Sequence, residues 1–358
     1  MRSLGRRSFA CVISYSSLCL SIDTLTTHGD KLNLATAPSR PREQRAADFA
    51  ARLRDRSGIG VLGFPLSAFT EDGSGVDLDG FRAHLRRHLD SGVGGLFVCC
   101  GTGEFPSLDE DEYRAFIRTA VDEVHGTVPV IAGAGYGWAL ARRFAAIAED
   151  EGADAILLMP HYLISAPQAG LIAQVEKITE QTDLPVVLYQ RGQVAYTTET
   201  LQRLAEIPTV IGLKDGGSDF VELQRMTLDA DPGFLFFNGA LTAEIQYRAY
   251  AAVGISPYSS AVNSCVPEVA GAFFAATRTG DEVLIDTLLR EFYSPLVALR
   301  DRVPGYAVSL IKSTARMRGE RVGPVRAPLA APTREDLVEL ERIMRHGLDL
   351  VGGRFDDQ

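Results

Sequence analysis

The sequence predicts a (β/α)8 TIM barrel followed by a C-terminal helical extension, and two observations support this fold class. From Gly58 onward, eight short apolar runs alternate with amphipathic stretches of helical periodicity. Each run is nearly all apolar, which is typical of parallel strands covered on both faces. Eight such units are the number that closes a barrel. The expected strands are residues 59–64, 95–99, 128–132, 155–159, 186–189, 210–214, 234–238 and 254–258.

Helical patterns fill the gaps between these runs and continue after the last one. The helices expected within the barrel are residues 77–91, 109–125, 139–151, 167–181, 198–207, 220–229 and 242–253. Four more are expected at 267–277, 281–300, 307–318 and 333–348, although a barrel needs only one further helix. We therefore expect a barrel over residues 46–265 and an appended helical region over 266–350.

An open, doubly wound sheet is the competing architecture, and it would suit an NAD-dependent oxidoreductase. Its dinucleotide fingerprint is missing, because Gly133, Gly135 and Gly137 follow a strand with the spacing GxGxG rather than GxGxxG. The barrel is therefore the favoured interpretation.

Composition limits the classes of partner. The 358 residues carry a net charge of -10, and so acidic a surface repels nucleic-acid phosphates. Five cysteines form no CxxC pair, which favours a reducing compartment, and we expect a cytoplasmic protein. The adjacent Cys99 and Cys100 are interpreted as small packed residues. No apolar run is long enough for a transmembrane helix, so no membrane contact is expected.

Residues 1–45 differ from the rest of the chain. Arg2, Arg6 and Arg7 precede a short apolar run, which faintly resembles a targeting peptide, but serines interrupt that run and no clear cleavage site follows it. We interpret residues 1–45 as a disordered or wrongly included extension, and residues 35–43 as a linker.

Lys214 is the most informative single residue. It closes the apolar run 210–213 and precedes Asp215 and two glycines. An amine that attacks a carbonyl must be neutral, and an apolar environment favours the neutral form. Taken alone, the same pattern also fits a strand-end lysine that reaches solvent.

Other polar residues follow neighbouring strands, and the C-terminal strand ends are where barrels carry catalytic groups. Tyr189 and Arg191 end the fifth strand and can relay protons and pair with a carboxylate. The second strand is followed by Gly101, Thr102 and Gly103, a plausible carboxylate cradle that is weak evidence alone. Tyr189 and Lys214 should be neighbours if both point inward, because adjacent strands lie about 4.8 Å apart.

Two further features are assigned less weight. Ser259 and Ser260, at the end of the eighth strand, are either pocket residues or simple turn residues. His84 and His88 are four residues apart on a helix, but Leu85 stands where a metalloprotease would have glutamate, so we interpret them as surface histidines. No metal site is expected.

The core resembles the dihydrodipicolinate synthase / N-acetylneuraminate lyase superfamily of Schiff-base barrels. The carrying segments are Gly101-Thr-Gly-Glu, the strand-end Tyr189-Gln-Arg, and Gly212-Leu-Lys-Asp. Within the superfamily, residues 58 to 348 are most similar to the 5-dehydro-4-deoxyglucarate dehydratases. The distinguishing segments are residues 101–108, 166–171, 214–217, 258–263, 295–312 and 322–328. Four residues depart from the usual family pattern, namely Cys100, His161, Gln190 and Val262.

The resemblance implies roles for these residues. Lys214 would form an imine with a keto sugar acid, and Tyr189 would move protons. The backbone of Gly101, Thr102 and Gly103 would hold the α-keto carboxylate, and Arg191 or Ser260 would contact the distal end. The implied reaction yields 2,5-dioxopentanoate, water and carbon dioxide, with no cofactor beyond the covalent lysine imine. A homo-oligomer, either a dimer or a tetramer, is also implied by the resemblance.

Two alternatives share this barrel. The first is an aldolase or dehydratase for another 2-keto-3-deoxy sugar acid, since the same residues would serve it. The second is a non-catalytic paralogue that binds a sugar acid, because function depends on the site and not on the fold.

Overall fold

The eight strands of the described chain form one parallel sheet in the order β7-β6-β5-β4-β3-β2-β1-β8. The computed structural model describes residues 41–355, to which all structural statements refer. β1 pairs with β8, and Asn238 of β7 bridges to Tyr258 beside β8, so the sheet closes on itself. The predicted barrel is confirmed, and the open sheet is excluded. The strands are β1 (Leu62–Gly63), β2 (Gly95–Val98), β3 (Val130–Ala134), β4 (Ala155–Leu158), β5 (Val186–Gln190), β6 (Val210–Asp215), β7 (Leu235–Asn238) and β8 (Ser259–Ser260).

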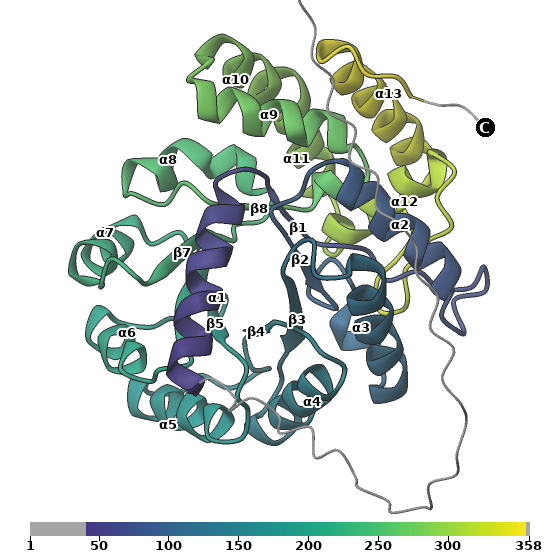
Figure 1. Cartoon of the computed structure of the whole chain (residues 1–358). Coiled ribbons are helices and arrows are strands. Elements are labelled where there is room, and N and C mark those ends of the chain that lie inside the picture. Colours follow the sequence, from purple (N-terminus) through teal and green to yellow (C-terminus); the bar gives the residue numbers. More distant parts are fainter. Residues whose placement is uncertain (1–40, 356–358) are drawn as a thin grey trace, which may run out of the picture. The chain divides into compact units, whose positions relative to one another are not determined.

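Helices on the outside connect the strands, as Figure 1 shows. Several begin at a side chain that accepts a hydrogen bond from the first turn, which satisfies an otherwise unpaired backbone N–H. The α3 helix begins with a full capping box between Asp109 and Glu112. The connecting helices are α2 (Leu78–Asp90), α3 (Glu110–Val124), α4 (Trp138–Asp150), α5 (Gln168–Thr179), α6 (Thr198–Ala205), α7 (Phe220–Asp229) and α8 (Tyr247–Ala252), the last preceded by the 3-10 turn η2 (Ala243–Gln246).

The eighth strand was misplaced by the sequence pattern. Residues 254–258 precede the strand, which consists of Ser259 and Ser260 alone. Gly254 has a φ of +84°, which suits a turn after α8, and Pro257 has no N–H to give to a strand ladder. Only Ile255 and Tyr258 of this segment are buried, and Tyr258 takes part in an isolated β-bridge.

An additional helix, α1 (Arg42–Ser57), covers one end of the barrel and was not predicted. Its apolar stripe follows helical spacing and consists of Ala46, Phe49, Ala50 and Leu53, all buried. Arginines of α1 donate to the carbonyls of Val93 (3.0 Å) and Gly233 (2.6 Å), which lie just before β2 and β7. The helix therefore closes the N-terminal ends of the strands, crossing the barrel in purple in Figure 1, and residues 42–45 belong to it and not to an extension.

The C-terminal region forms helices that pack against the barrel. α9 and α12 both contact the short turn η3 (Val262–Ser264) that follows β8, as does α2. The predicted helix over 281–300 is continuous but contains a π-helical turn, η4. The described residues, 41–355, belong to one compact unit. The elements are α9 (Pro267–Thr279), α10 (Glu282–Leu288), η4 (Leu289–Tyr293), α11 (Ser294–Arg300), α12 (Tyr306–Met317) and α13 (Arg334–Leu350).

The prediction that His84 and His88 are surface residues was wrong, because their side chains are buried between α2 and the C-terminal part of the chain. His84 Nδ1 lies 2.6 Å from a carboxylate oxygen of Glu320, and its Nε2 accepts from the Leu66 backbone N–H at 3.1 Å. His88 contacts Asn263 at 3.0 Å, and burial lowers its pKa well below the ordinary value. The two rings therefore connect α2 to the segments that contain Leu66, Asn263 and Glu320.

The remaining sequence predictions concern cysteines, membranes and metals. Cys99 and Cys100 are free and buried, as expected for packed residues. Among residues 41–355, no helix is both long and apolar enough to cross a bilayer, and no group of three or more histidine, cysteine or acidic side chains could hold a metal ion. The predicted extension, with Cys11 and Cys19, lies outside the described residues except for its last positions.

Candidate active site

Lys214 and Tyr189 lie side by side at the C-terminal ends of β6 and β5. The register of the two strands pairs these residues directly. The Nζ atom of Lys214 is 3.9 Å from the centroid of the Tyr189 ring and 5.0 Å from that of Phe64. Both side chains are buried, with 5% and 6% of the residue exposed. An amine and a phenol thus share one partly enclosed, mainly aromatic environment.

The space for the lysine depends on a glycine. A Cβ atom at position 239, just after β7, would lie 2.6 Å from both Cγ and Nζ of Lys214. Any larger residue would therefore displace the amine. Within the described chain, no carboxylate forms an ion pair with Lys214, so no protein acid holds it away from a ligand.

Tyr189 is placed among groups that favour proton transfer. Its hydroxyl oxygen accepts from Arg191 Nη1 at 3.2 Å, and the hydroxyl donates to the Gly239 carbonyl at 3.4 Å. Burial alone would raise its pKa, but the nearby charges of Lys214 and Arg191 outweigh burial and lower the pKa of Tyr189 below its ordinary value. A phenol with a lowered pKa gives up its proton more readily than one in water.

The predicted carboxylate cradle is only partly in the cavity. Gly101 and Thr102 line it, and no described residue is hydrogen-bonded to the Thr102 hydroxyl, which leaves that hydroxyl for a ligand. Gly103 is not among the lining residues; it is buried behind the loop, and its carbonyl accepts from the Ser67 hydroxyl at 2.6 Å. Cys99 takes a φ of +51° where the chain leaves β2, and this turn directs Gly101 and Thr102 to the strand ends.

A buried ion pair fixes this loop to the C-terminal region. Lys312 Nζ of α12 lies 2.7 Å from Glu104 Oε1, and both side chains are at most 1% exposed. The other Glu104 oxygen accepts from the backbone N–H of Arg326 at 2.8 Å. Burial, offset in part by Glu104, lowers the pKa of Lys312 to about 8. The residues that follow Gly101 and Thr102 are therefore held by a segment more than 200 positions away.

The structure places Ser259, and not Ser260, in the cavity. Ser260, the second residue of β8, is fully buried and does not line the cavity. Its hydroxyl donates to Glu244 Oε1 at 2.5 Å. Successive strand residues face opposite sides of a sheet, so a one-residue difference decides which serine faces a ligand. Sequence reasoning identified the pair but not the orientation.

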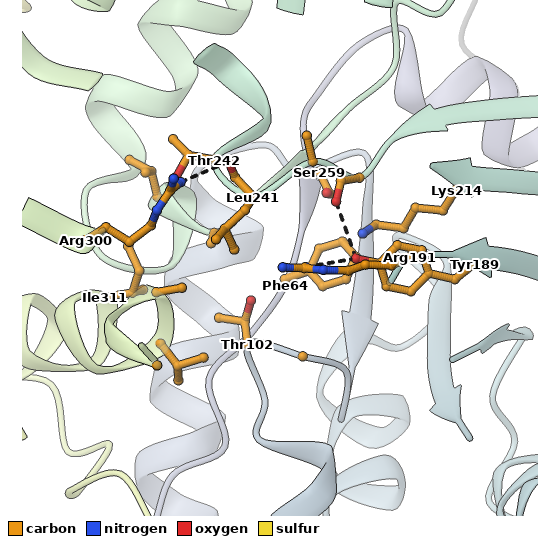
Figure 2. A pocket seen from close by; sticks show the side chains of 18 of the residues that line it. Phe64, Thr102, Tyr189, Arg191, Lys214, Leu241, Thr242, Ser259, Arg300 and Ile311 are labelled. Atoms are coloured by element: carbon orange, nitrogen blue, oxygen red, sulfur yellow. Dashed lines mark hydrogen bonds between the residues drawn. The ribbon is translucent and has the colours of Figure 1, made fainter. Parts of the chain in front are cut away.

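These residues surround a cavity of about 330 Å³, shown in Figure 2. Its charged lining residues are Lys214, Arg191 and Arg300, and none of the described lining residues is an acid. In a chain with a net charge of -10, this lining is suited to an anionic ligand. Sequence reasoning predicted Lys214, Tyr189, Arg191, Gly101 and Thr102 here.

Sequence reasoning missed the wall of the cavity that the C-terminal region provides. This wall comes from α11, α12 and the loops beside them, and consists of Leu296, Arg300, Gly305, Ala307, Val308, Leu310, Ile311 and Leu329. No local motif marks these residues, because they reach the cavity only through the packing of the tail on the barrel. Their one sequence signal was the resemblance over residues 295–312.

Three of the four departures from the family pattern lie outside the cavity lining. Gln190 donates to Asp215 at 2.7 Å and accepts from the Tyr196 backbone, so it ties β5 to β6. Cys100 is buried inside the barrel, and His161 contacts Gln174 and Ile164 within its own loop and helix. Only Val262 lines the cavity.

Comparisons with known proteins identify the family of this chain. The chain is 62% identical over 301 residues to a probable 5-dehydro-4-deoxyglucarate dehydratase 2 of Streptomyces avermitilis, covering 84% of this chain and 91% of the relative. It is 60% identical to the protein of the same name in Streptomyces coelicolor, over 88% and 97% of the two chains. The crystal structure of a dihydrodipicolinate synthase from Bacillus anthracis superposes with a TM-score of 0.71 at 26% identity, covering 80% of this chain and 97% of that one. The sequence model of the dihydrodipicolinate synthetase family matches residues 58–347, so the chain belongs to that family.

Proposed function

We propose that this chain converts 5-dehydro-4-deoxyglucarate into 2,5-dioxopentanoate, water and carbon dioxide through an imine on Lys214. The observation that carries the proposal is the paired amine and phenol at the end of a cavity lined by cations and by no acid. The names of the relatives that are 62% and 60% identical support the choice of substrate.

The amine of Lys214 attacks the ketone carbon next to one carboxylate. Tyr189 supplies a proton to the oxygen that leaves as water, and a protonated imine remains. The carboxylate beside the imine carbon lies against Gly101 and Thr102, where the free Thr102 hydroxyl can donate to it. Gly103 contributes to the shape of this loop from behind.

The protonated imine then acts as the electron sink for two bond cleavages. The C–H bond beside the imine carbon becomes acidic, and its loss expels the β-hydroxyl as water. The resulting conjugated iminium accepts the electron pair of the bond to the distal carboxylate, which leaves as carbon dioxide. Protonation of the resulting dienamine at carbon, with tautomerisation of the enol to the aldehyde, restores the imine. Hydrolysis of this imine by water releases the product and the amine. The lysine supplies the electron sink, so the reaction as proposed requires no separate cofactor.

An aldolase or dehydratase for another 2-keto-3-deoxy sugar acid would use the same amine and phenol, so product analysis separates it from the proposed reaction. The test is to incubate the purified chain with 5-dehydro-4-deoxyglucarate, with and without borohydride, and to measure intact mass, peptide masses and products. We expect a reduced adduct on Lys214 alone, and 2,5-dioxopentanoate with carbon dioxide in the untrapped sample.

Two other lysines of the described chain serve as internal controls in that experiment. Lys177 is exposed and pairs with Glu180, and Lys312 is buried and pairs with Glu104. An adduct on Lys177 would indicate non-specific labelling. An adduct on Lys214 without the expected product would indicate that the substrate is another keto sugar acid. No adduct at all would overturn the proposal in favour of a binding protein.

Homo-oligomerisation remains a prediction. Tyr162, Leu163 and Ile164, in the loop between β4 and α5, are 75%, 72% and 65% exposed. Three adjacent exposed apolar side chains are more consistent with a covered surface than with a free one. Light scattering of the purified chain would measure its mass, for which we expect a dimer or tetramer.

A further inference from the structure

The end of the cavity away from Lys214 has a different chemical character. Its wall consists mainly of aliphatic side chains from the C-terminal region. Arg300, at the end of α11, is the one charged residue on this wall, and Thr242 lies beside it. Figure 2 shows Arg300 and Thr242 on one side of the cavity and Lys214 and Tyr189 on the other.

Arg300 is held in place by four of its five N–H groups. Two of them, on Nε and Nη2, donate to the Asp301 carboxylate at 2.7 and 3.0 Å. Two more, both on Nη1, donate to the Leu241 carbonyl at 3.0 Å and to Thr242 Oγ1 at 2.7 Å. Its side chain is 12% exposed. A rigid guanidinium therefore retains one N–H, on Nη2, for a ligand.

Thr242 is oriented by this contact. Since its oxygen accepts from Arg300, its own hydroxyl proton is free, and no described residue accepts it. Its φ is +55°, a left-handed backbone conformation that a β-branched residue rarely adopts. Strained residues of this kind concentrate at ligand sites, where the surrounding structure keeps them in place.

We propose that Arg300 and Thr242 bind the second carboxylate of the substrate, so that the site selects keto acids with a carboxylate at each end. The inference rests on the proposed function and names the distal contact within it. Of the two residues first expected in this role, Ser260 is engaged with Glu244 behind β8, and Arg191 donates to Tyr189 at the other end of the cavity.

The arrangement also suits a carboxylate that must leave. A full charge on the arginine would stabilise the carboxylate and oppose its conversion to neutral carbon dioxide. The paired Asp301 already offsets that charge, and the aliphatic wall provides little further stabilisation. The distal carboxylate is thus oriented by two hydrogen bonds and not held by an unpaired cation. When its bond breaks, the electron pair moves into the conjugated iminium.

Two six-carbon 2-keto acids test the proposal without any turnover. 2-Oxoadipate has a carboxylate at each end and no β-hydroxyl, so it can form the imine but cannot be dehydrated. 2-Oxohexanoate has the same length and lacks the distal carboxylate. The measurement is the concentration of each that gives half-maximal borohydride trapping on Lys214. We expect the wild type to bind 2-oxoadipate at least about 10-fold better, because hydrogen bonds to charged groups are worth this factor or more.

The Arg300→Gln variant should bind 2-oxoadipate about 10- to 100-fold more weakly while 2-oxohexanoate is trapped as in the wild type. Asp301→Asn, which removes the negative charge beside Arg300 and frees the N–H that the lost carboxylate oxygen held, should tighten 2-oxoadipate several-fold. Asp301 is 57% exposed, so this variant should fold normally. Arg290→Gln, which removes an exposed arginine outside the cavity, is the matched control and should change neither ligand.

A structural role for Arg300 predicts a different pattern. If it only holds the loop of Leu241 and Thr242, Arg300→Gln would weaken both keto acids equally, and this result would overturn the proposal. Equal trapping of the two keto acids by the wild type would also overturn it. A wild type that prefers 2-oxoadipate yet does not turn over 5-dehydro-4-deoxyglucarate would instead refute the proposed function and leave the distal carboxylate site intact.

Discussion

The two ends of the cavity are built in different ways. The Lys214 end comes from neighbouring strands, where the parallel register places Tyr189, Lys214 and Gly239 next to one another. The Arg300 end comes from helices outside the barrel and from the strained turn at Thr242. The proposed chemistry thus depends on the most constrained part of the fold, and the proposed substrate selection depends on a part that can change while the strands keep their places.

The largest effect is expected from Lys214→Ala. It removes the group proposed to form the imine, so turnover should fall by on the order of 10⁴-fold or more, and borohydride trapping should disappear. The fold should persist, because no described carboxylate loses an ion-pair partner. Trapping by intact mass and circular dichroism measure both effects. Lys177→Ala is the control for loss of a lysine, and substantial activity in Lys214→Ala would place the chemistry elsewhere.

Arg191→Gln should change the pH dependence of the Lys214 end. Arg191 is one of the charges that lower the pKa of Tyr189, so its removal should raise that pKa and move the corresponding inflection in the trapping rate to higher pH. Pyruvate, which lacks a distal carboxylate, is the ligand for this measurement. Tyr189→Phe should slow trapping by about 10²-fold or more and lose the inflection. An inflection that survives in Tyr189→Phe would belong to another group.

Glu104→Gln tests the connection between the two ends of the cavity. It breaks the buried ion pair between Glu104, in the loop after β2, and Lys312 of α12. It leaves the Lys312 charge unpaired, and the free energy of unfolding should fall by about 3–5 kcal/mol. The pKa of Lys312, already lowered to about 8, should fall further, so the folded protein sheds this proton before the unfolded chain does. Stability should therefore recover as pH rises toward the ordinary lysine pKa of 10.5.

Urea denaturation at pH 6 and pH 9.5 measures this recovery. The double variant Glu104→Gln/Lys312→Met removes both charges and is the matched reference. It should be more stable than Glu104→Gln at pH 6 and should lack the recovery. A Glu104→Gln variant as stable as the wild type at pH 6 would show that the pair does not hold the two ends together.

The smallest effect is expected from Glu244→Gln, which alters a contact between β8 and η4. Glu244 accepts from Ser260 and from Tyr293 of η4, and burial raises its pKa to about 7 from 4.5. The stability from this protonated carboxyl is complete below pH 4.5 and is lost as pH rises through 7. The wild type should thus lose about 3 kcal/mol between pH 4.5 and pH 8 that Glu244→Gln retains. Urea denaturation at the two pH values measures the free energy of unfolding of both proteins. An equal change with pH in the wild type and in Glu244→Gln would contradict this prediction.

The barrel strands and the residues at their C-terminal ends could be predicted from the sequence, because these residues contact neighbours on adjacent strands. Apolar runs revealed the strands, and the residues that end them identified Lys214, Tyr189, Arg191, Gly101 and Thr102. Helix α1 escaped detection because only four buried apolar side chains stand among its arginines, next to a segment of linker composition.

Residues whose partners are distant in sequence could not be assigned in this way. His84 is buried by Glu320, 236 positions away, and Arg300 contacts Thr242 across 58 positions. Neither pairing leaves a local pattern. The choice between Ser259 and Ser260 depends on the facing of a two-residue strand, which is too short to show alternation.

The late position of the cavity wall has a consequence for protein synthesis. A ribosome makes the N-terminal part of a chain first, and the strands with Lys214 and Tyr189 emerge well before α11, α12 and Leu329. Until residues 296–329 follow, the reactive amine lacks the wall that selects its substrate, and Glu104 lacks Lys312. The proposed selectivity therefore arises only after residue 329 has been synthesised.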